Sequence, residues 1–111
     1  MVNLTVICVV FDPIMAYTTD SLQFLERATE TLRAAAHPIR LSIIGLLAEE
    51  GPRTVKHIHE SLDIQQPVAS HHLRIMKDKG IVDVERDGQN SRYGLRDKRF
   101  AGLLEIMREL I

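Results

Sequence analysis

The sequence has one cysteine, no tryptophan and no long apolar run. Cys8 has no partner for a disulfide within the chain, so a disulfide-rich secreted scaffold is excluded and we expect a reducing, cytoplasmic setting. Only 6 of the 111 residues are glycine and 4 are proline, which argues against a disordered or collagen-like chain. No stretch reaches the roughly 18 apolar residues of a membrane span, so we expect no membrane contact.

The longest apolar stretch, Leu4 to Phe11, ends at Asp12 and Pro13. It has no basic segment before it and no small-residue cleavage pattern close behind, so a signal peptide is not expected. Two interpretations stay open for residues 1–14. They form an apolar extension with a short strand, or they are an artefact of the assigned start and Met15 is the natural one. Residues 15–111 suffice for one domain with a buried core.

Charge is distributed unevenly along the chain, although the formal net charge is only −1. Residues 53–99 hold ten Lys and Arg against seven Asp and Glu, whereas the rest of the chain holds four basic and eight acidic residues. A positive segment on a negative body indicates a surface that meets a polyanion. A solvated face of mixed charge is the competing explanation, because many neutral proteins show a similar imbalance.

Apolar residues recur at helical spacing through the first two thirds of the chain. The pattern predicts helices over residues 19–36, 38–50, 54–63 and 67–79. Pro38 and Pro67 suit first helical positions, Thr54 can act as a cap, and Gly80 can end the fourth helix. The second of these helices is apolar enough for nearly complete burial.

Two short strands and a last helix follow. Residues 81–86 and 91–95 predict strands around the turn signal Asp87-Gly88, and Asp97 can cap an amphipathic helix. The fold class is therefore mainly α with a small β-hairpin (α+β), in the order α-α-α-α-β-β-α. A helix pair with a short turn, followed by a hairpin, is typical of a winged helix-turn-helix, which places its second helix in the DNA major groove.

The predicted fourth helix has two faces. Ala69, Leu73 and Met76 share the inward face, and the opposite face carries Pro67, Ser70, His71, Arg74 and Lys77. Ser70 and His71 can exchange hydrogen bonds with base edges, Gln66 can pair with adenine, and Arg74 with guanine or a phosphate. These residues could instead be a cap and ordinary surface side chains. His72, one residue further round, is expected to pack against the neighbouring helix.

Further polar residues flank the predicted hairpin turn, namely Gln89, Asn90 and Arg92. They would let the hairpin tip approach the DNA backbone or minor groove. Arg92 could instead be a solvated edge residue that nearby acids neutralise. Lys56 and Thr54, at the start of the third helix, are either phosphate contacts or surface residues.

The segment from Leu32 to Leu95 resembles the ArsR/SmtB family of bacterial dimeric winged-helix repressors. The resemblance rests on HPIRL, ASHHLRIM, KGIV and RDGQNSRYGL, which occur here in the family order. It implies a homodimer that represses transcription from an inverted-repeat operator in double-stranded DNA and releases it when an inducer binds. It also implies base reading by Gln66, Ser70 and His71. The first and last helices would form the dimer interface, here through Leu22, Leu25, Leu32, Phe100, Leu103, Leu104 and Met107.

The residues with which many members of that family bind metal are missing. Thr54, Val55 and Lys56 stand where a cysteine pair would, and a second family site keeps Asp97 but has Arg99 and Leu110 at other ligand positions. Arginine is not a metal ligand. We therefore expect no metal and no cofactor, and an inducer, if there is one, that is an unknown small molecule or a redox signal.

Two other classes of function have less support in the sequence. A winged-helix dimer that binds another protein through the fourth helix is the alternative, because the net charge is near neutral. The polar outward face argues against it, since a protein-binding helix usually presents apolar anchors. No phosphate-binding glycine loop, paired carboxylates or nucleophile with its base is recognisable, so we expect no enzyme and no catalytic residues.

Overall fold

The computed structural model describes residues 19–111, so the interpretations of residues 1–14 and of Cys8 lie outside it. The chain divides into two compact units between Glu30 and Thr31. Helix α2 (Thr19–Ala35) crosses this boundary, and its residues 19–30 are all that is described of the first unit. The second unit, residues 31–111, contains the remaining elements. No helix among the described residues has the length and apolar character that crossing a membrane requires.

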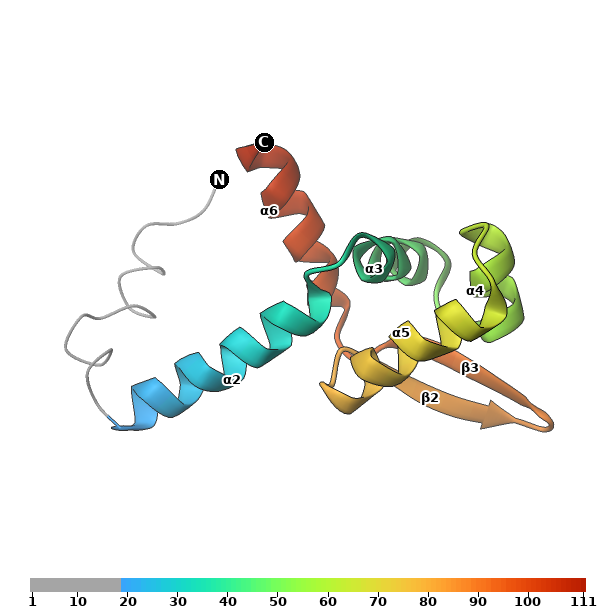
Figure 1. Cartoon of the computed structure of the whole chain (residues 1–111), viewed down its shortest axis with the longest axis horizontal. Coiled ribbons are helices and arrows are strands. Elements are labelled where there is room, and N and C mark those ends of the chain that lie inside the picture. The colour runs from blue at the N-terminus through green and yellow to red at the C-terminus, as the bar shows by residue number, and fades with distance from the viewer. Residues whose placement is uncertain (1–18) are drawn as a thin grey trace. The chain divides into compact units, whose positions relative to one another are not determined.

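The second unit is a winged helix-turn-helix. Its elements after α2 are α3 (Pro38–Glu50), β1 (Arg53–Thr54), α4 (Val55–Ser61), α5 (Gln66–Asp78), β2 (Val82–Asp87), β3 (Asn90–Leu95), the 3-10 helix η2 (Lys98–Ala101) and α6 (Gly102–Leu110). Figure 1 labels the helices α3 to α6 and the strands β2 and β3. Helices α4 and α5 form the helix-turn-helix pair. The β2–β3 hairpin is the wing, and it extends beyond the helices. The predicted fold class is confirmed.

The sheet differs from the prediction in two details. A two-residue strand, β1, pairs with β3 and makes a three-stranded antiparallel sheet in the order β1-β3-β2. Two residues are too few to show a period, so the sequence pattern does not predict this strand. Asp87 pairs with Asn90, so the turn consists of Gly88 and Gln89, one residue beyond the predicted Asp87-Gly88. Gly88 has a φ of 64°, a value that glycine adopts without steric cost.

Two helices begin differently from the prediction. Helix α5 starts at Gln66, after Gln65 as an extended N-cap residue, because Pro67 is tolerated anywhere in the first turn, where no helical N–H bond is lost. Asp97 does cap the C-terminal segment, and its carboxylate accepts a hydrogen bond from the Arg99 N–H at 2.8 Å. The first turn after it is the 3-10 helix η2, and α6 begins only at Gly102.

The core fixes the orientation of α5. Ala69, Leu73 and Met76 of α5 are fully buried, which confirms the predicted inward face, and they lie with Ile43 and Ile44 of α3 in the core of this unit. Burying one such large side chain contributes roughly 1.5–3 kcal/mol. Helix α3 itself is less buried than expected, because only Ile43, Ile44 and Leu47 are inaccessible. The buried face fixes the rotation of α5 about its own axis, so the same opposite face always points to solvent.

Candidate nucleic-acid interface

Apart from Pro67, the outward face of α5 is polar at its predicted contact positions. Every one of them is exposed to solvent: Gln66, Pro67, Ser70, His71, Arg74 and Lys77. Their exposure follows from the buried face on the other side of the same helix. The structure therefore brings these side chains together on one accessible surface, which we call the α5 face.

The two cations of the α5 face have different surroundings. Arg74 forms no ion pair with any residue of the described range 19–111, so its guanidinium is available to an external anion. Lys77 lines a shallow hollow of about 550 Å³ together with Asp83, Glu85 and Arg92 of the wing. The carboxylates there offset part of its positive potential. Arg74 is thus the stronger anion-binding position.

One polar residue at the start of α5 was not identified from the sequence. Gln65 is the N-cap residue, is exposed, and makes no capping hydrogen bond with its side chain. Its amide therefore lies beside Gln66 with hydrogen-bonding groups that the helix does not use. The sequence contained a signal for Gln65, because polar residues are common at the position just before a helix begins.

The wing has one acidic face. Side chains alternate along a strand, so Asp83, Glu85 and Asp87 share a face of β2, and Arg92 lies opposite Glu85 on the same face. Arg92 Nη2 is 3.6 Å from Asp87 Oδ2, and Arg96 donates two hydrogen bonds to Asp83 at 3.0 and 3.1 Å. Arg92 is exposed as predicted, but its nearest charged neighbours are carboxylates.

A second wing cation, Arg86, was also not identified from the sequence. It pairs with Ser91 across the hairpin, on the face opposite the acidic row. It is exposed and forms no ion pair within residues 19–111. The period-two alternation of β2 separates Arg86 from the acids and was the available signal. Gln89 and Asn90 are exposed at the hairpin tip as expected.

The candidates at the start of α4 differ in their surroundings. Lys56 is exposed and could approach a phosphate. The Thr54 hydroxyl accepts a hydrogen bond from the His57 N–H at 3.2 Å, so Thr54 serves as the helix cap. Because the hydroxyl is already used in capping, Thr54 is a weaker candidate for a phosphate contact.

The predicted dimer residues fall into two groups. Leu22, Leu32 and Met107 are exposed by 50%, 53% and 46%, while Leu25 is half-buried. Phe100, Leu103 and Leu104 are half-buried and pack against the core of the second unit. Three further exposed apolar residues of the C-terminal segment were not identified from the sequence: Ile106, Leu110 and Ile111.

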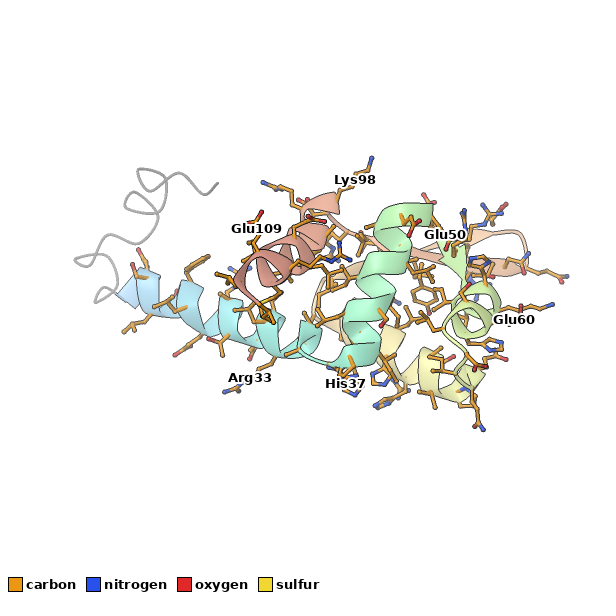
Figure 2. All side chains as sticks on the ribbon, turned by 90° about the horizontal axis from the view of Figure 1, so that it is seen from above. Arg33, His37, Glu50, Glu60, Lys98 and Glu109 are labelled. Carbon is orange, nitrogen blue, oxygen red and sulfur yellow. The ribbon has the colours of Figure 1, made fainter. Side chains whose placement is uncertain are left out.

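The predicted loss of metal ligands can be compared with the local geometry. The Arg99 guanidinium donates to both Asp97 oxygens, at 2.7 Å in the closest contact. Hydrogen bonds from the Arg99 side chain and backbone lower the pKa of Asp97 to about 2. His57 Nε2 is 2.9 Å from Glu50, and Figure 2 shows Glu50 at the opposite end of α3 from His37. No three potential ligands converge among residues 19–111, and the absence of metal binding stays a prediction.

Comparison with known proteins identifies relatives along most of the chain. Residues 37–84 match the model of the arsR family of bacterial regulatory proteins. An uncharacterized HTH-type transcriptional regulator of Methanocaldococcus jannaschii is 39% identical over 85 residues, which cover 77% of this chain and 96% of that protein. The HTH-type transcriptional repressor SmtB of Mycobacterium tuberculosis is 38% identical over 82 residues, 74% of this chain but only 60% of SmtB.

The solved structures agree with the sequence relatives. A homodimeric winged helix-turn-helix DNA-binding domain from Mycobacterium bovis, described as a possible ArsR-family transcriptional regulator, superposes with a TM-score of 0.74 at 25% identity. The superposition covers 83% of this chain and 87% of that domain. The likeness therefore extends well beyond the helix-turn-helix pair.

Proposed function

This chain belongs to the arsR family of bacterial regulatory proteins, and from that premise we propose that two copies form a repressor that recognises an inverted repeat in double-stranded DNA in the cytoplasm. The family consists of transcriptional regulators and not of enzymes. The observation that carries the proposal is the α5 face, a row of exposed polar and cationic side chains on a helix whose other side is fully buried.

The α5 face has the chemistry that direct reading of bases needs. Gln66, Ser70 and His71 supply hydrogen-bond donors and acceptors for base edges in the major groove. Arg74, Lys77 and Lys56 supply positive charge for phosphates, which positions the helix without reading sequence. Because the residues that read bases lie on one rigid helix, their spacing is set before DNA arrives.

The wing is assigned to the backbone or minor groove beside the helix. Gln89 and Asn90 are exposed at its tip, and Arg86 and Arg92 are its cations. Arg86 lies away from the acidic row, whereas Arg92 shares a face with it. We therefore add Arg86 to the contacts predicted from the sequence and expect its contribution to exceed that of Arg92.

A dimer is needed to cover the apolar surface of α6. On this short helix Ile106, Met107, Leu110 and the terminal Ile111 are between 46% and 95% exposed, which is unusual for large apolar side chains gathered on one element. A second copy that packs α6 and α2 against their equivalents would bury them. Twofold symmetry then places two α5 helices in successive major grooves about 34 Å apart.

The inducer is proposed not to be a metal bound at the positions other members of the family use. Arg99 occupies both oxygens of Asp97, and Thr54 is engaged in capping α4. Releasing Asp97 for a metal would require breaking this charge-assisted hydrogen-bonded pair. A small organic molecule or a redox signal is left as the inducing stimulus.

In vitro selection from a randomised double-stranded library tests the proposal, because it assumes no particular operator sequence. The full-length protein should enrich an inverted repeat whose half-sites are one helical turn apart. Retention of DNA without enrichment of any sequence would reduce the activity to phosphate attraction. Failure to retain DNA even at low salt would favour a protein-binding role for the same helix.

A further inference from the structure

His72 is the one polar residue that is buried within the described part of the chain, with 7% of its surface exposed. It lies on α5 directly after His71, a residue of the α5 face. Arg40 of α3 donates a hydrogen bond from Nε to His72 Nδ1 at 3.1 Å. The same guanidinium donates from Nη1 to the Ala34 carbonyl of α2 at 3.2 Å. Arg40 thus joins α5 to the elements that precede it.

Two more imidazoles complete the cluster. The His37 ring centroid is 4.5 Å from that of His72, and the His71 ring is 5.4 Å from it in an edge-on arrangement. His37 also caps α3, because its Nδ1 accepts the Ile39 N–H at 3.1 Å. Figure 2 shows His37 at the start of α3. The cluster therefore runs from the start of α3, through buried His72, to the exposed His71.

The Arg40 hydrogen bond fixes the protonation state of His72. A guanidinium can only donate, so Nδ1 must carry a lone pair and the proton of the neutral ring must be on Nε2. Burial lowers the pKa of His72, and the charges of His37, Arg40 and His71 act in the same direction. These groups face His72 from the start of α3 and from its own helix, while α2 contributes the Ala34 carbonyl through Arg40. Protonation of His72 at Nδ1 would place its N–H against the Nε–H of Arg40.

We propose that Arg40 and His72 are positioning residues for base reading, and that specific DNA binding requires His72 to be neutral and is lost on acidification. The inference rests on the proposed function of the α5 face. Hydrogen bonds to base edges depend on donor and acceptor geometry, so a displaced α5 loses sequence preference first. Attraction to phosphates does not fall in parallel, because protonation adds positive charge near the DNA.

The ratio of affinities for the selected operator and for an unrelated duplex is therefore the measurement. It is followed by fluorescence anisotropy at constant ionic strength from about pH 7.5 down to about pH 5, the range in which histidines titrate. Below the pKa of His72 the ratio should fall by up to about tenfold per protomer for each pH unit. A ratio that does not change with pH would overturn the inference.

Three variants assign the pH dependence to one residue. In His72→Asn the amide oxygen takes the place of Nδ1 and cannot be protonated, so the ratio should be independent of pH. His59→Asn in α4, which removes a histidine that bonds to the Ile64 carbonyl, should keep the wild-type response. His71→Asn should keep the slope too, although it weakens binding. A wild-type slope in His72→Asn contradicts the inference.

Nuclear magnetic resonance of the wild-type protein gives a test that does not depend on any variant folding. The His72 ring should carry its proton on Nε2, and operator binding should lower its pKa, because linkage is reciprocal. A His72 pKa that rises on operator binding, while the operator preference is intact, overturns this inference but not the proposed function. Lack of any operator preference at about pH 7.5 would instead refute the proposed function and, with it, this inference.

Discussion

Arg74→Ala gives the most quantitative test of the α5 face as a DNA-binding surface. Arg74 is exposed and has no ion-pair partner among residues 19–111, so its removal deletes a charge without disturbing another ion pair. Each phosphate contact contributes about 0.9 to the slope of log affinity against log salt concentration. A dimer has two copies of Arg74, so the slope should become shallower by about 1.8.

The size of this change makes it measurable. Between about 50 and about 200 mM salt, a slope difference of about 1.8 corresponds to roughly 12-fold less weakening of the variant than of the wild type. Anisotropy titrations over a series of salt concentrations in this range would measure it, with operator and with unrelated duplex. Both duplexes should show the same change, because a phosphate contact carries no sequence information.

Arg99→Ala is the matched control. Arg99 is a highly exposed arginine on η2, but its guanidinium is held by Asp97 and it lies outside the α5 face and the wing. Its removal should leave the slope unchanged. An unchanged slope in Arg74→Ala, or an equal change in Arg99→Ala, would refute the reasoning that free cations on the α5 face meet the phosphates.

Four other substitutions test the packing of α5, two glycine turns and the proposed dimer interface. Leu73→Ala removes a fully buried side chain and should cost about 2–5 kcal/mol of unfolding free energy in urea titrations; a loss below about 1 kcal/mol would contradict the packing of α5. Gly80→Ala should cost about 1–2 kcal/mol for its left-handed φ. Gly88→Ala should cost about the same, because Gly88 also has a left-handed φ. The atom that a Cβ at Gly80 would approach to 2.8 Å is the end of the flexible Arg96 side chain, which can move away, and Gly88 faces open space. A much larger loss for Gly80→Ala than for Gly88→Ala would contradict this. Met107→Glu should shift the protein from dimer to monomer in sedimentation velocity, since it places a charge in the proposed apolar interface; an unchanged dimer would exclude α6 from that interface.

The fold could be predicted closely because its local signals agree with each other. Pro38, Gly51 and Gly80 mark helix ends by their backbone conformation, and Thr54 marks one by its side-chain cap. Tertiary packing does not override these local signals. The errors arose where the local signal was weak. Strand β1 is too short to show a period, and the start of α5 depends on which of two adjacent residues takes the cap position.

The candidate site could be predicted in its central part and less well at its edges. Helical spacing alone separates the exposed Ser70, His71 and Arg74 from the buried Ala69 and Leu73, because both faces lie on one continuous helix. The alternation along β2 already separates Arg86 from the acidic row, but which residue lies beside it on β3 depends on the cross-strand register.

The Arg40–His72 bond could not be predicted from helical spacing. It joins residues 32 positions apart, and only the packing of α3 against α5 brings them together. The sequence did predict that His72 packs against a neighbouring helix, which the structure confirms, but not its partner.

The central claim is that the α5 face reads bases, and Gln66→Ala tests it most directly. Affinity for the selected operator and for an unrelated duplex would be measured side by side at one salt concentration. Without the Gln66 amide in each half-site, operator affinity should fall by about 1–3 kcal/mol per protomer, while the affinity for unrelated DNA should not change. If both affinities fell by the same factor, or neither changed, Gln66 would not read a base and the account of the α5 face would be contradicted.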